Sequence, residues 1–101
     1  MYIKKETFSK PINDVYRTSI DSARELGWKI LEEKPESCEI KARTGATLRS
    51  WGEEILIKAY PEPNGTTISV ASEATSQLFD WGKSDENEKA FLEELKRKIS
   101  R

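Results

Sequence analysis

The chain has 101 residues, of which 17 are basic and 18 acidic, and its formal charge is -1. This length fits a single domain spanning residues 1–101, and the balanced charge provides no broad positive field to attract nucleic acid or an anionic membrane, so neither is expected as a partner. No apolar run reaches 18 residues, so neither a membrane span nor a signal peptide is expected. The lone Cys38 excludes an intrachain disulfide and favours a reducing, cytoplasmic location. Fourteen Glu and eleven Lys against one Gln resemble the composition of proteins from hot environments.

The first predicted elements are a strand and a helix. Residues 2–8 mix apolar side chains with three charges, which favours a short edge strand. Ser9 is the predicted N-cap of the helix, with Pro11 tolerated in its first turn. Apolar residues recur at spacings of three and four through residues 12–26, and Gly27 stands where a left-handed residue ends a helix.

Four strands are predicted next. Residues 28–33 form the first, and residues 38–44 alternate apolar and polar side chains, which makes Cys38 a small core residue. Residues 55–59 and 68–72 alternate in the same way around a turn that ends in Asn64-Gly65. Because both residues accept positive φ angles, we expect this segment to form a β-hairpin.

The last predicted element is a helix that begins after Ser84 and carries an apolar stripe from Phe91 to Ile99. The element order is therefore strand, helix, four strands, helix. Short turns between successive strands favour an antiparallel meander, and two amphipathic helices need the same apolar sheet face. The sequence predicts an α+β two-layer sandwich with both helices on one face, and a helix-grip arrangement if the sheet curls around the terminal helix.

Residue types exclude most catalytic chemistry. The chain contains no histidine, so a histidine-dependent nucleophile is impossible, and neither a metal site nor a cofactor is expected. Glu53 is the one carboxylate of interest, since unbroken alternation would turn it inward with Ile55, where burial would raise its pKa. A bulge at Gly52 would place it in water instead, and we assign it no catalytic role.

The best local indication of binding comes from aromatic residues outside the periodic segments. Trp51 and Trp81 each precede a glycine, and Arg49 and Lys83 lie close by in the sequence. Tryptophans on loops can form a ligand or partner surface, and nearby cations can add charge to it. In a small domain they also commonly close the end of the core.

Short runs of the sequence resemble small α+β domains of unknown function. Ile68-Ser69-Val70-Ala71-Ser72, Asp80-Trp81-Gly82-Lys83 and Asn87 resemble their final strand, loop and helix start. Glu25-Leu26-Gly27-Trp28 and Ser50-Trp51-Gly52-Glu53 resemble their helix exit and strand entry. The resemblance implies the fold and carries no active site.

Three functional hypotheses follow. The first is a non-catalytic binding module that holds an apolar small molecule between sheet and helix, or a protein partner at the Trp51 and Trp81 end. The second is a carboxylate enzyme centred on Glu53. The third is an assembly subunit that pairs through the edge strand at residues 2–8.

Overall fold

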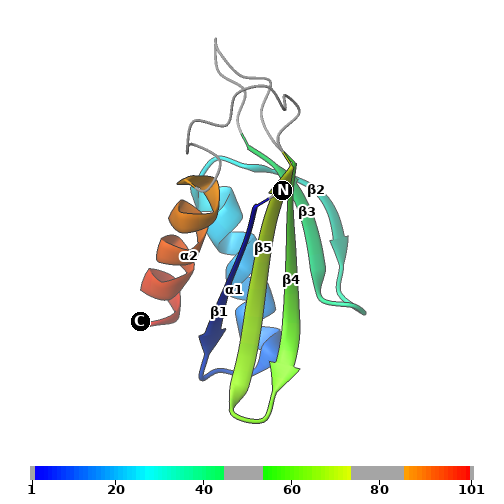
Figure 1. Ribbon diagram of the computed structural model, residues 1–101. Coiled ribbons are helices and arrows are strands. Elements are labelled where there is room, and N and C mark those ends of the chain that lie inside the picture. Colours follow the sequence, from blue (N-terminus) through cyan, green and yellow to red (C-terminus); the bar gives the residue numbers. More distant parts are fainter. Residues whose placement is uncertain (1, 45–53, 74–85, 101) are drawn as a thin grey trace.

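A computed structural model of the chain describes residues 2–44, 54–73 and 86–100 (Figure 1). Its elements are β1 (Tyr2–Phe8), α1 (Ile12–Glu25), β2 (Lys29–Lys34), β3 (Glu39–Arg43), β4 (Glu54–Glu62), β5 (Gly65–Glu73) and α2 (Glu86–Ile99). The predicted order of strands and helices is confirmed.

The five strands form one antiparallel sheet in the order β1-β5-β4-β3-β2. The last four strands along the chain are the predicted meander. β1 pairs with β5 along its whole length, from Tyr2 opposite Ser72 to Phe8 opposite Thr66. β1 is therefore an edge strand, and α1 carries the chain from this edge of the sheet to β2 at the other.

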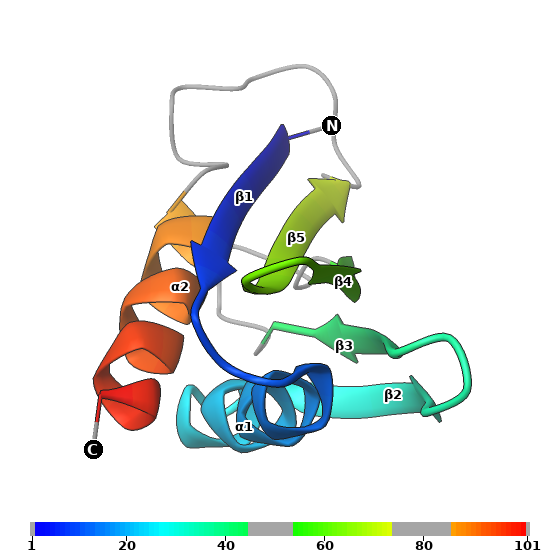
Figure 2. The same ribbon diagram turned by 90° about the horizontal axis from the view of Figure 1, so that it is seen from below.

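Both helices lie on the same side of the sheet, which bends around them (Figure 2). α1 packs over the inner side of β2 to β5, whereas α2 lies against α1, β1 and β5. The core between the two layers consists of buried apolar side chains from both helices and every strand except β2, together with Trp28 just before β2. These residues are Phe8, Val15, Ala23, Trp28, Ile40, Ala42, Ile55, Ile57, Ala59, Ile68, Val70, Phe91, Leu92 and Leu95.

The two ends of α1 differ in how well the sequence predicts them. Gly27 has a φ of 81° and ends the helix as expected. The predicted N-cap at Ser9 is wrong, because the helix is entered through Pro11, whose extended backbone provides no side-chain cap. Ser9 instead lies exposed in the connection between β1 and α1.

Cys38 does not belong to a strand. The strand predicted at residues 38–44 begins one residue later, at Glu39. The φ of Cys38 is 55°, and this residue closes the turn that precedes β3. The Cys38 carbonyl accepts a hydrogen bond from the Ala59 amide at 2.9 Å, and its thiol points back toward the Pro35 carbonyl. The residue is half-buried against the core, so its side chain contacts the interior while its backbone makes a turn.

The β4-β5 hairpin has a tighter turn than predicted. Glu62 pairs with Gly65, which leaves only Pro63 and Asn64 between the strands. Positive φ angles were expected at both Asn64 and Gly65. Gly65 has a φ of 155°, whereas the φ of Asn64 is not positive. A β-carbon on Gly65 would lie 1.9 Å from the Phe8 carbonyl oxygen, so close approach of the end of β1 requires glycine here.

Candidate functional site

The four residues predicted to form a site, Arg49, Trp51, Trp81 and Lys83, lie outside the described residues. Glu53 also lies outside them. Whether these side chains form one site therefore stays a prediction. The structure does describe the ends of the strands and of the helix to which the two segments connect.

Those attachment points lie at one end of the sheet. Arg43, the last residue of β3, pairs with Glu54, the first of β4, and Glu54 pairs with Glu73, the last of β5. α2 begins at the same end of the molecule (Figure 1). The segments 45–53 and 74–85, which contain all the predicted site residues, thus leave from neighbouring strand ends.

The inner layer at this end contains a buried hydroxyl without a hydrogen-bond partner in the described structure. Ser72 is 1% exposed and pairs in register with Ile55, a fully buried core residue. The other buried hydroxyls are satisfied locally: Ser19 and Ser22 donate to α1 carbonyls, and Thr66 donates to the Lys10 carbonyl at 2.8 Å. Ser72 therefore differs from these three residues, because its hydroxyl has no hydrogen-bond partner among the described residues.

Glu88 adds a second buried polar side chain near the start of α2. It is fully buried, and it precedes Phe91, Leu92 and Leu95 at spacings of three, four and seven. Glu88 is not predicted from the sequence, because only apolar residues are assigned to the buried face of this helix. The spacing could have identified it, since position 88 falls on the same helical face as the apolar residues.

Two ion pairs link α2 to the elements beside it. The Lys96 ammonium lies 3.5 Å from a carboxylate oxygen of Glu6 in β1, and the Lys98 ammonium lies 3.3 Å from a carboxylate oxygen of Glu25 in α1. These pairs tie α2 to the strand and helix beside it. Exposed ion pairs of this kind each contribute little to stability, so the apolar core determines how the layers pack.

The described ranges, 2–44, 54–73 and 86–100, contain no group of three or more His, Cys, Asp or Glu side chains that could hold a metal ion. None of their helices has the length and apolar character needed to cross a bilayer.

No protein-family model matches the chain, and a search of curated proteins found no match. Among solved structures, 13 chains match the fold. One is the crystal structure of Ara h 8.0201, with a TM-score of 0.67 over 99% of this chain and 97% of that chain, at 8% sequence identity. This likeness shows the fold alone. It confirms the α+β prediction and resolves its open alternative in favour of a helix-grip fold.

Proposed function

We propose that this protein is a non-catalytic binding module for an apolar small molecule that carries one hydrogen-bonding group. The ligand would lie at the end of the inner layer where β5 ends and α2 begins. The helix-grip fold supports a binding role, because a bent sheet and the helices it surrounds can enclose an apolar guest between two layers.

The observation that carries the proposal is the Ser72 hydroxyl. A buried hydroxyl without a partner costs about 1–3 kcal/mol, and native proteins seldom retain one without a use for it. Sites for apolar ligands combine mainly apolar walls with a few polar groups that fix the orientation of the ligand. Ser72 beside Ile55 has this combination, with Glu88 as a second buried polar group at the same end.

Arg49, Trp51, Trp81 and Lys83 keep the role predicted for them as part of this proposal. The segments that contain them start from adjoining strand ends, which supports a shared surface at the mouth of the site. Tryptophan would cover the apolar part of the ligand, and the cations would favour a ligand whose polar end is anionic.

The test uses straight-chain fatty acids and fatty alcohols as probes. Binding is followed by tryptophan fluorescence and by amide chemical shifts in a nitrogen-15 labelled protein. We expect saturable binding, with a shift at Ser72, and loss of the fluorescence response in the Trp51→Phe, Trp81→Phe double variant. Trp28 stays in that variant as an internal reference, because it is buried against the core.

Ser72→Val tests the proposed hydrogen bond directly. It should weaken alcohol binding about fivefold to tenfold, because one hydrogen bond contributes roughly 1 kcal/mol net. Ser19→Ala is the matched control, because Ser19 is equally buried but donates to the Val15 carbonyl. Equal affinities for the parent protein and both variants, or shifts confined to other parts of the molecule, would contradict the proposal.

A further inference from the structure

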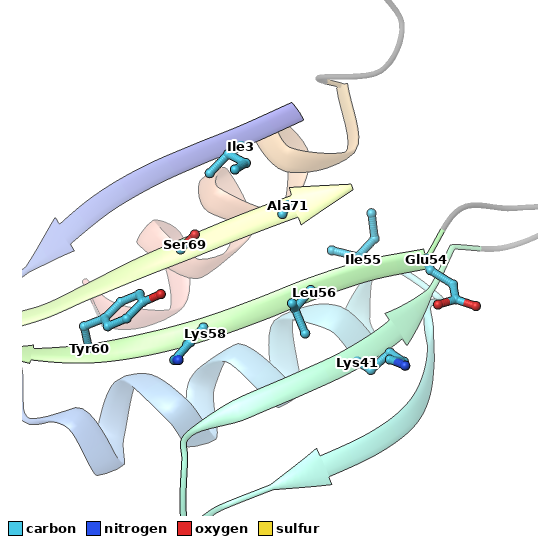
Figure 3. Close-up of a pocket in the computed structure, with 9 residues that line it drawn as sticks. All are labelled: Ile3, Lys41, Glu54, Ile55, Leu56, Lys58, Tyr60, Ser69 and Ala71. Carbon is cyan, nitrogen blue, oxygen red and sulfur yellow. The ribbon is translucent and has the colours of Figure 1, made fainter. Parts of the chain in front are cut away.

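The outer face of the sheet, away from the helices, contains a groove of about 380 Å³ (Figure 3). Its apolar surface is formed by Ile3 of β1, Ala71 of β5, and Leu56 and Tyr60 of β4, and two lysines, Lys41 and Lys58, lie beside it. We call these six residues the outer groove. Ile55 of β4 also borders this groove, but the six named residues lie on the opposite side of the sheet from Ser72, because alternate residues of a strand face opposite sides.

Strand register assembles the apolar part of the outer groove. Ile3 pairs with Ala71, Ala71 pairs with Leu56, and Leu56 pairs with Lys41, so one row crosses four strands. Ile3, Leu56 and Tyr60 are 55%, 46% and 39% exposed. Three large apolar side chains that share one hollow while open to water are typical of an interaction surface.

Some of the charged side chains around the row form ion pairs, and others do not. The Glu54 carboxylate forms an ion pair with the Arg43 guanidinium, with nitrogen and oxygen 3.0 Å apart. Lys58 lies 3.2 Å from Glu39 and 5.1 Å from the centre of the Tyr60 ring. Lys41, and Lys5 in the next row, make no ion pair within the described structure. The uncompensated charge beside the apolar row is therefore positive, and an occupant should be negative there.

The shape of the outer groove favours a helix over a small molecule. A small ligand site usually encloses 70–90% of its guest, and an open sheet face with half-exposed walls does not. From β1 to β4 the row spans two strand spacings, about 10 Å, which matches the diameter of an α-helix. A helix can place apolar side chains on Ile3 and Leu56 and reach Lys5 and Lys41 with carboxylates on its flanks.

We propose that the outer groove is a docking site for an acidic amphipathic helix of a partner protein. The helix axis runs along the strands, so that the apolar stripe of the helix crosses the row formed by Ile3, Ala71 and Leu56. Its Glu or Asp side chains pair with Lys41 and Lys5, while the Tyr60 ring closes one end of the contact. This interaction uses the outer face of the sheet, so a ligand in the inner layer can be bound at the same time.

The experiment uses a fluorescein-labelled synthetic helix of about four turns, with a leucine stripe flanked by glutamates. Two comparison peptides have the same length: one replaces the glutamates by lysines, and one scatters the leucines around the helix. Fluorescence anisotropy gives the affinity, and amide shifts give the location. We expect the acidic amphipathic peptide to bind most tightly, with shifts at Ile3, Leu56 and Tyr60.

Matched variants separate charge from apolar contact. Lys41→Glu should weaken binding of the acidic peptide about fivefold or more, whereas Lys10→Glu, an exposed lysine outside the outer groove, should change it less than twofold. Leu56→Ser should weaken binding about tenfold, whereas Leu31→Ser, on the exposed part of β2, should not. Both substituted groove residues are exposed, so the fold is expected to tolerate the changes.

Three outcomes overturn the proposal. The first is equal binding of the acidic and the basic peptide, and the second is chemical shifts that map to the inner layer. The third is a different occupant of the same surface, either a second copy, seen as a dimer that Leu56→Ser dissociates in sedimentation, or decanoate that shifts the outer groove while the peptides do not.

Discussion

The Trp28 indole stacks on the Phe91 ring, with centroids 5.7 Å apart and planes inclined by 16°. The contact joins the residue that follows the α1 cap to the middle of α2, over 60 positions later in the chain. Both rings are buried, so this pair joins α2 to the connection between α1 and β2 within the core. Aromatic pairs of this kind add about 0.5–1.5 kcal/mol beyond the apolar area that they bury.

Phe91→Ala should therefore be strongly destabilising. Removal of a fully buried phenylalanine costs about 3–5 kcal/mol, and α2 should be the first element to lose protection from hydrogen exchange. Chemical denaturation followed by far-ultraviolet circular dichroism measures the change. Leu31→Ala, at an exposed apolar residue, is the control and should shift stability by less than about 0.5 kcal/mol.

The two described glycines with positive φ predict different costs for the same substitution. Gly27→Ala should cost about 1–2 kcal/mol, because its φ of 81° disfavours a side chain although no atom lies within 4 Å of the added carbon. Gly65→Ala should cost more, roughly 3 kcal/mol, since the β-carbon would overlap the Phe8 carbonyl and push β1 away from the hairpin. Equal midpoints of urea denaturation for the two variants would contradict this ranking.

Ser72→Ala should leave the ligand-free protein as stable as before or stabilise it by about 1 kcal/mol, because it removes a buried hydroxyl that lacks a partner. The comparison is Thr66→Val, which removes a hydroxyl that donates to the Lys10 carbonyl. That change should destabilise the protein by about 1 kcal/mol or more. Thermal denaturation of the two variants gives the sign of each effect.

Tyr16 predicts how stability responds to alkaline pH. Burial raises the pKa of its phenol above the ordinary value of 10.0, and the charge of Glu33 acts in the same direction. A raised pKa means that the folded protein favours the neutral phenol, so the contribution is complete below pH 10.0 and is lost as the pH rises through the folded value. In Tyr16→Phe, the free energy of unfolding should fall less steeply above this pH. An identical slope in the parent protein would show that Tyr16 contributes nothing.

The sequence predicted the order of the elements because the apolar spacing in α1, α2, β4 and β5 is regular. It predicted their ends less well. Ser9 has the chemistry of an N-cap, but Pro11 takes that position because its backbone is extended there. Cys38 continues the alternation of β3, yet its φ of 55° depends on a turn that pattern alone cannot reveal.

The candidate site was less predictable for a physical reason. Ser72 is of interest because its buried hydroxyl has no hydrogen-bond partner among the described residues, and Glu88 because its side chain is fully buried. Neither property can be predicted from residue type. The outer groove depends on register across four strands, which pairs Ile3 with a residue 68 positions later. An alternating pattern shows that Leu56 faces outward, but not which residues it meets.

Strand β2 has a further consequence for how the protein behaves in concentrated solution. Its pairing with β3 shifts between Ile30 and Glu32, so Leu31 forms a bulge, and four of its six residues are charged. A bulged and charged border is a poor template for a foreign strand. We therefore expect cross-β fibres not to grow from this side of the molecule, even in crowded preparations.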